Sequence, residues 1–142
     1  MLFRSSHQNF LEHHSDEFIE MAYSYERLER VENPDGYGKR VGDCGDTVEI
    51  FLTIDGETIK HVSIQIDGCL NTVACANTVA TMTEGKTVEE AWEVTPEKVA
   101  AYLKTLEEDH FHCAELSVGA FFLALNDHRQ KTRNGWKKTY SR

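Results

Sequence analysis

The sequence predicts an α+β fold, a small antiparallel three-stranded sheet with helices packed on one face. Apolar and polar residues alternate strictly over 47–54 and again over 61–67, as they do in strands with one buried face. Asp55-Gly56 between the two runs is a hairpin turn signal, so the two strands should pair antiparallel. Helical spacing precedes and follows the strands, and this separation of strands from helices is typical of an α+β fold.

The length and composition fit one domain that spans residues 1–142. Apolar residues make up 40% and charged residues 27%, and the mean hydropathy is −0.49, which indicates a globular domain without a membrane span. The start, "MLFRSSHQNFLEHH", lacks the apolar stretch of a signal peptide, so we expect a cytoplasmic protein with reduced thiols. Four cysteines then indicate metal-binding or reactive thiols rather than disulfides.

The charge is distributed unevenly along the chain. The basic C-terminal tail, about 128–142, holds six Lys or Arg residues and no acid, which leaves nine basic and 24 acidic residues on 1–127, a charge of −15. This acidic body should repel nucleic acid. The tail itself is interpreted as a solvated helix end, with a docking strip for an acidic partner as the alternative.

The first predicted helix covers about 16–31. Ser15 is a suitable N-cap, and Asn33-Pro34 is a stop signal. Apolar residues recur at helical spacing and are predicted to face the core: Phe18, Met21, Ala22, Tyr25 and Leu28.

The next segment, "NPDGYGKRVGDCGD", concentrates four glycines and predicts an irregular loop. A phosphate-binding loop is an alternative for such a segment. The Lys-Ser/Thr ending of that motif is absent, however, and no strand is predicted before it, so we expect a loop with unusual backbone angles.

Three or four further helices follow the strands. The first, "NTVACANTVATMTEG", is rich in small residues that let a helix lie close to a sheet, and Gly85 ends it. A capping box at 87–90 opens a short helix, and Thr95 caps another with Pro96 in its first position. The last helix begins near Cys113. Its predicted inward residues are Leu116, Ala120, Leu123 and Ala124.

Candidate metal ligands gather at the ends of the predicted elements, where functional side chains are usually presented. They are Cys44, Asp46, Cys69, His112 and Cys113. Thiolates and imidazole suit zinc and iron–sulfur iron, and a carboxylate is a harder, weaker substitute for a thiolate. Cys75 lies inside a helix, and we interpret it as a buried structural thiol.

Cys113 is suited to two roles. It stands at a helix N-terminus, where the macrodipole favours the thiolate, so it can act as a ligand or as a nucleophile. The gaps of 25 residues from Cys44 to Cys69 and 44 from Cys69 to Cys113 match no general zinc motif. The donor set therefore predicts metal binding more strongly than the spacing does.

Several of these motifs together resemble one family. "ENPDGYG", "GDCGD" before a strand, "DGC" before a small-residue helix, "GKTVEEA", and "HCAEL" at the start of the last helix are similar to the iron–sulfur cluster assembly scaffolds, the family of IscU and the N-terminal domain of NifU. The resemblance runs from about Glu32 to Asp127 in the same order.

The resemblance implies a scaffold rather than an enzyme, with the IscU/NifU fold. A cysteine desulfurase would deliver sulfur as persulfide, iron would join it, and a transient 2Fe-2S cluster would be built and passed to apo-proteins. The resemblance implies Cys44, Cys69 and Cys113 as the cluster thiolates, Asp46 as the carboxylate at the site and His112 as an alternative ligand. Cys113 would also be the persulfide acceptor. Zinc in the same pocket as isolated, and a homodimer, are compatible with this assignment.

One stretch departs from the family. Many members carry Leu-Pro-Pro-Val-Lys before the His-Cys pair, a site for an Hsp70-type chaperone, whereas this chain has Leu-Glu-Glu-Asp-His-Phe at 106–111. The departure argues against hand-off through that chaperone. It also puts His110 at the lysine position, either as an extra ligand or proton donor or as an exposed loop residue.

Three alternatives share the same residues. The first is a zinc-bound sulfur-transfer protein of the SufU type, although the stretch between Gly85 and His112 is short for the insertion of those relatives. The second is a cysteine hydrolase with Cys113 as nucleophile, which would leave three cysteines idle. The third is a structural zinc domain, which a chain of 142 residues does not need for its core.

Overall fold

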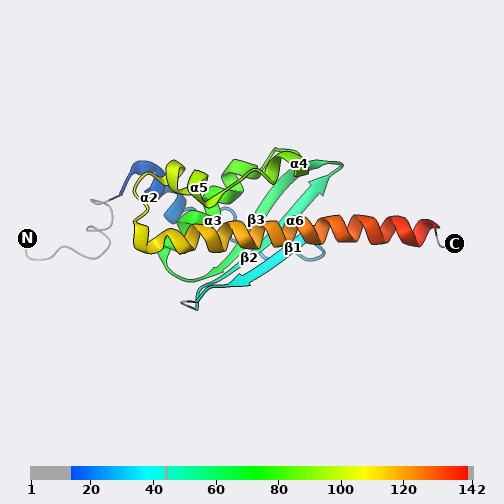
Figure 1. The fold of residues 1–142 in the computed structure, drawn as a ribbon, viewed down its shortest axis with the longest axis horizontal. Helices are drawn as coiled ribbons and strands as arrows, with labels where there is room; N and C mark the ends of the chain where they lie inside the picture. Colours follow the sequence, from blue (N-terminus) through cyan, green and yellow to red (C-terminus); the bar gives the residue numbers. More distant parts are fainter. Residues whose placement is uncertain (1–13, 44, 141–142) are drawn as a thin grey trace, which may run out of the picture.

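A three-stranded antiparallel sheet is the centre of the fold, as predicted (Figure 1). The computed structural model describes residues 14–43 and 45–140, and side chains as far as residue 133. The strands lie in the order β1-β2-β3. In chain order the elements are α2 (Asp16–Ala22), β1 (Gly36–Val41), β2 (Thr47–Asp55), β3 (Thr58–Asp67), α3 (Leu70–Thr83), α4 (Val88–Ala91), α5 (Pro96–Leu103), the 3₁₀ turn η1 (Glu108–His110) and α6 (Phe111–Tyr140).

The predicted helix at 16–31 is shorter in the structure and ends at Ala22. Residues 27–29 instead run beside β3, where the Ile64 amide donates to the Arg27 carbonyl (2.7 Å) and the Glu29 amide donates to the Ile64 carbonyl (3.1 Å). These bonds to a distant strand replace the helical bonds that local spacing favours. Tyr25, predicted to face the core, is therefore 67% exposed.

The glycine-rich segment predicted as a loop begins as a strand. β1 pairs with β2 along its whole length, from Gly36 opposite Leu52 to Val41 opposite Thr47. A Cβ atom on Gly36 would lie 2.5 Å from the Ala124 carbonyl oxygen of α6. Because the glycines of this strand have no side chains, α6 can lie directly on it. The glycines also interrupt the apolar alternation that predicts a strand from sequence.

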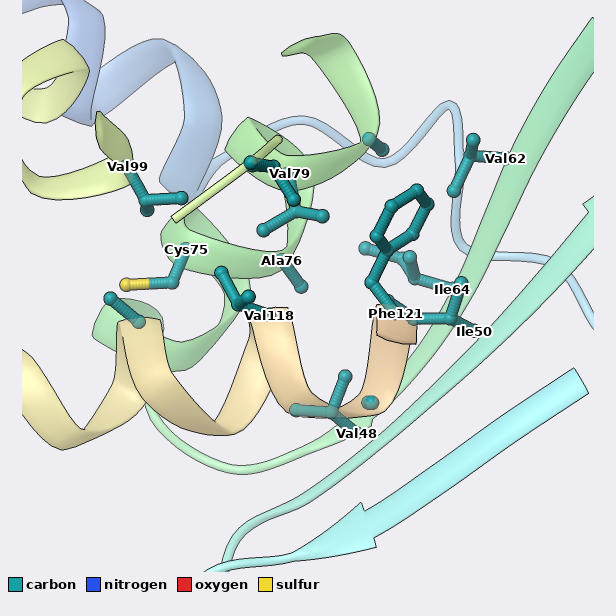
Figure 2. Packing of buried hydrophobic residues seen from close by; sticks show 14 of the residues in the cluster. Val48, Ile50, Val62, Ile64, Cys75, Ala76, Val79, Val99, Val118 and Phe121 are labelled. Atoms are coloured by element: carbon teal, nitrogen blue, oxygen red, sulfur yellow. The ribbon is translucent and has the colours of Figure 1, made fainter. Parts of the chain in front are cut away.

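The core lies between the sheet and the helices α3, α5 and α6. Figure 2 shows Ile50, Val62 and Ile64 of the sheet beside Phe121 of α6, with Cys75 of α3 among the helices. All five side chains are fully buried. Small residues on α3, Ala74, Ala76 and Ala80, are buried as well, as the close approach of this helix requires.

The predicted caps are confirmed. The Thr87 hydroxyl accepts from the Glu90 amide (3.1 Å) while the Glu90 carboxylate accepts from the Thr87 amide (3.0 Å), a complete capping box. Thr95 caps α5 by accepting from the Lys98 amide (3.1 Å). These bonds satisfy amides that the first turn of each helix leaves unpaired.

The last helix, α6, begins at Phe111, two residues before the predicted start, and its C-terminal part projects beyond the sheet (Figure 1). Leu116, Ala120 and Ala124 are buried as predicted, but Leu123 is 46% exposed. Phe121 fills the inward position instead. Across the part of the chain that the structure describes, no helix is both long enough and apolar enough to span a membrane.

Candidate metal centre

The site forms where the loop before β2, the start of α3 and the start of α6 meet. Asp46 lies on the loop, Cys69 caps α3, and Cys113 is the third residue of α6. Each element end brings one donor, so side chains far apart in the sequence converge on one place. Cys44, predicted as a ligand, lies outside the described residues.

Cys69 presents an exposed thiol at the N-terminus of α3. Its backbone carbonyl accepts from the Thr72 amide (3.0 Å), so the main chain enters the helix here. Its side chain makes no capping bond to the helix. The sulfur instead accepts from the Asn71 amide group at 3.8 Å and lies 3.8 Å from the Asp46 carboxylate. The thiol is therefore not used to cap the helix and is available to the site.

Cys113 is 1% exposed and faces α3 from the first turn of α6. Its sulfur lies 3.4 Å from the Thr72 hydroxyl oxygen and 3.7 Å from Nε2 of His112. The sequence thus predicted correctly that Cys113 stands at a helix start, but this thiol is much less accessible than Cys69.

Asp46 is held between Thr72 and Gly68. Its Oδ2 accepts a 2.5 Å hydrogen bond from the Thr72 hydroxyl. A Cβ atom on Gly68 would lie 2.7 Å from the Asp46 carboxyl carbon, so a side chain at position 68 would displace the carboxylate. The glycine before Cys69 therefore leaves room for the Asp46 carboxylate in this position.

Thr72 is a site residue that sequence reasoning missed. Its side chain is fully buried, and its oxygen lies 3.4 Å from Cys113 Sγ and 3.6 Å from Cys69 Sγ. A hydroxyl carries one proton, and the shorter bond to Asp46 assigns that proton to the carboxylate. The available signal was its position three residues after Cys69, on the same face of the helix.

The imidazole that joins both thiols belongs to His110. A ring nitrogen of His110, Cys69 Sγ and Cys113 Sγ all lie within 4.8 Å of one another. The family resemblance implies His112 as an alternative ligand and leaves the role of His110 open. Within the described ranges, His112 lies beside Cys113 but is not part of this three-residue group.

Cys75 lies apart from the site as a core residue. It is fully buried between α3 and its neighbours (Figure 2). Burial raises the pKa of its thiol well above the ordinary value, and electrostatic interaction with the nearby Cys113 and Cys69 raises it further. A neutral, buried thiol is a poor nucleophile and a poor ligand, which fits a structural role.

The donors fit a borderline-soft metal. Bonds of about 2.3 Å to sulfur and about 2.0 Å to nitrogen in a tetrahedral site place the donors roughly 3.5 to 3.8 Å apart. Side-chain shifts of about 1 Å would therefore close the described group around an ion. A small α+β fold with thiol, imidazole and carboxylate donors at its element ends defines a class of metal- or cluster-binding domain.

Comparison with known proteins identifies the family within this class. The chain belongs to the NifU-like N-terminal domain family, whose family model matches residues 24–135. It is 30% identical to the iron–sulfur cluster assembly scaffold protein IscU 1 of Archaeoglobus fulgidus over 120 residues, 83% of this chain and 78% of that protein. It is also 30% identical to IscU of Rickettsia prowazekii over 128 residues, 80% of this chain and 97% of that protein.

Solved structures share the fold. A putative SUF-system scaffold protein, FiSufU from Fervidobacterium islandicum AW-1, superposes with a TM-score of 0.67 at 19% identity over 85% of this chain and 99% of that one. A NifU-like N-terminal protein from Brucella abortus gives a TM-score of 0.68 at 15% identity over 82% and 94%. The three-stranded sheet with its helices is therefore the fold of these scaffold structures.

Proposed function

We propose that this protein is a scaffold for iron–sulfur cluster assembly. It accepts sulfur from a cysteine desulfurase, combines it with iron as a 2Fe-2S cluster, and passes the cluster to apo-proteins. The observation that carries the proposal is the convergence of Cys69, Cys113 and Asp46 from three element ends, in a chain whose relatives are named as such scaffolds.

The ligand set explains how such a scaffold both holds and releases its cargo. The proposed ligands are the thiolates of Cys44, Cys69 and Cys113 and the carboxylate of Asp46, with His112 as the alternative fourth ligand. Thiolates bind iron–sulfur iron strongly, whereas a carboxylate oxygen is a poor match for it. A site with three thiolates and one weaker ligand binds well enough for assembly and loosely enough for transfer.

Cys113 is the proposed persulfide acceptor. In the transfer step its thiolate attacks the terminal sulfur of the desulfurase persulfide. The new bond joins Cys113 Sγ to that sulfur, the old sulfur–sulfur bond breaks, and the desulfurase cysteine leaves as a thiolate. Because Cys113 is 1% exposed, this delivery requires the site to open around it.

The proposed partners are a cysteine desulfurase and apo iron–sulfur proteins, in the cytoplasm. The stretch at 106–111 carries three acidic residues and neither proline nor lysine, so recognition by an Hsp70-type chaperone through a Leu-Pro-Pro-Val-Lys site is not part of the proposal. An acidic body also makes nucleic acid an unsuitable partner.

A second function, zinc-bound sulfur transfer, is favoured by one observation. Cys69, His110 and Cys113 form a thiol and imidazole group of the kind that zinc prefers. In this alternative the pocket holds zinc and accepts sulfur without building a cluster.

Anaerobic reconstitution tests the proposal. The protein is incubated with a cysteine desulfurase, cysteine and ferrous iron, and visible absorbance, iron and acid-labile sulfide are measured. A coloured protein that loads an apo-ferredoxin is expected. Replacing Cys44, Cys69 or Cys113 by Ser should abolish stable assembly, whereas Cys75→Ala, the matched control, should retain it. A colourless protein with stoichiometric zinc and no transfer would favour the second function.

A further inference from the structure

We propose that the end of the molecule opposite the metal centre binds an acidic segment of a partner protein. The segment carries Asp or Glu residues beside one aromatic or aliphatic side chain. It occupies a groove, named the Trp92 groove, that lies between α6 on one side and α4 with the β2–β3 turn on the other. The proposal goes beyond the cluster-assembly function and does not depend on it.

The Trp92 groove lies far from the metal centre. The centre forms where β2 begins, whereas the groove lies beside the turn after Asp55, at the other end of that strand. Figure 1 shows α4 at this second end, where α6 projects beyond the sheet. Along α6, Arg129 of the groove is sixteen residues, or about 24 Å, from Cys113. A partner bound there leaves the metal centre accessible to other proteins.

Trp92 gives the groove a fixed apolar surface. Its ring is half-buried and lies 5.2 Å from the ring of Phe122, which packs against the core. Val88 also lines the groove, whose volume of about 910 Å³ falls within the roughly 300 to 1,000 Å³ of typical ligand pockets. A rigid aromatic surface in a groove of this size suits an apolar anchor residue, because a few buried aromatic contacts carry much of the binding energy at protein interfaces.

Two guanidinium groups of α6 give the groove its positive charge. Arg129 and Arg133 are exposed, and neither forms an ion pair with any residue that the structure describes. The Arg129 guanidinium carbon lies 5.2 Å from the centroid of the Trp92 ring. A guanidinium that stacks on an aromatic ring still presents its N–H edge, which suits a carboxylate. The segment 134–142 adds three basic residues and no acid, so the positive charge continues along the chain.

The other side of the groove distinguishes a peptide from other polyanions. Glu57 and Glu89 line it, and their carboxylates repel negative charge. A membrane surface or a nucleic acid presents negative charge over its whole extent, whereas a peptide can direct its carboxylates to α6 alone. Residues 1–127 carry a charge of −15, which repels extended polyanions further. The charge pattern therefore favours a protein segment with its acidic residues on one side.

Peptide binding to the metal-free protein tests the proposal. The probe is a fluorescein-labelled peptide with a central Phe-Leu pair and Asp and Glu residues on one side, and its fluorescence anisotropy is measured. The first control peptide replaces Asp and Glu by Lys, and the second replaces Phe-Leu by Ala-Ala. We expect saturable binding of the probe that weakens with added salt, and at least about tenfold weaker binding of both control peptides.

Variants locate the bound peptide. Arg129→Ala/Arg133→Ala should weaken binding of the probe about tenfold at low salt. Lys39→Ala/Lys60→Ala is the matched control, because it also removes two exposed cations but lies outside the groove, and it should change the affinity less than about twofold. The indole N–H signal of Trp92, assigned through Trp92→Phe, should shift when the probe is added. Backbone amide spectra confirm that each variant is folded.

Three results of these measurements would overturn the proposal: no saturable binding of the probe, equal binding of the acidic and basic peptides, or equal losses of affinity in the two double variants. Tighter binding to phosphatidylserine vesicles than to the probe would overturn it as well and assign the groove to a membrane surface. Each of these results leaves the cluster-assembly function standing, because that function rests on residues at the other end of the sheet.

Discussion

The hydroxyl of Thr72 donates a 2.5 Å hydrogen bond to Oδ2 of Asp46, and this bond ties the first turn of α3 to the loop before β2. The same oxygen lies within 3.6 Å of the sulfurs of Cys69 and Cys113. One buried hydroxyl therefore sets the position of the carboxylate relative to both thiols.

Removal of this hydroxyl should loosen the site. Thr72→Val keeps the shape of the side chain but leaves the carboxylate without its donor, so we expect the free energy of unfolding to fall by about 1 to 2 kcal/mol in urea titrations. We also expect Thr72→Val to bind metal more weakly than wild type, because the carboxylate loses its fixed position. Thr72→Ser retains the hydroxyl and should therefore recover most of the lost metal affinity. Equal metal affinities of the Val and Ser variants would contradict the positioning role.

Asp46→Ala should make the cluster more persistent. Without the carboxylate, three thiolates remain with an imidazole free to take the fourth position, and less water is drawn to the site. The decay of visible absorbance in air should slow several-fold relative to wild type, and transfer to an apo-ferredoxin should slow with it. A variant that loses its cluster faster than wild type would show that Asp46 is an indispensable ligand.

Persulfide should form on Cys113 only when a desulfurase is present. Cys69 is exposed and Cys113 is 1% exposed, so, of the three described thiols, a small alkylating reagent alone should modify Cys69 before Cys113 and leave Cys75 unmodified. With desulfurase and cysteine, mass spectra of the digested protein should show the added sulfur on Cys113. Sulfur found only on Cys69 would transfer the acceptor role to that residue.

Glu84 should contribute to stability in a way that depends on pH. Burial raises its pKa, but hydrogen bonds from Arg27 and the Val62 amide, with the charges of Arg27 and His61, outweigh burial and hold the pKa below the ordinary value of 4.5. A lowered carboxyl pKa gives stability that is present above about pH 4.5 and is lost as pH falls through the folded-state pKa.

The variant Glu84→Gln tests this contribution. It should be less stable than wild type at pH 7, and the difference should shrink as the pH falls below 4.5 and through the folded-state pKa of Glu84. Thermal unfolding across this range measures the effect, and Glu26→Gln, at an exposed position, serves as the control. A difference that does not change with pH would exclude the charge of Glu84 as its cause.

The sequence predicted those features whose cause is local. The strand at 47–54, the capping box at 87–90 and the N-cap Thr95 all rest on residues within one turn or one strand, and the structure has each of them, although Phe51, predicted on the polar face of the strand, is buried. The placement of Cys69 and Cys113 at element ends followed from the same boundaries.

The features that the sequence did not predict depend on distant partners. The first helix ends at Ala22 because residues 27–29 bond to β3, and β1 is a strand because its glycines lie against α6. Thr72 and His110 become site residues only when α3 and η1 are brought together. A single sequence carries no direct signal for contacts between segments that lie far apart in the chain.

The contact between β1 and α6 has a consequence for how this chain can vary. A Cβ atom on Gly38 would collide with the main chain of α6 at Ala120, seven residues and about 10 Å along the helix from Cys113. One added methyl group there must push the helix outward, and the helix carries Cys113, one of the two described cysteines of the site. Tolerance to substitution is therefore not set by metal binding alone: Gly38, which is no ligand, is restricted by the main chain of α6.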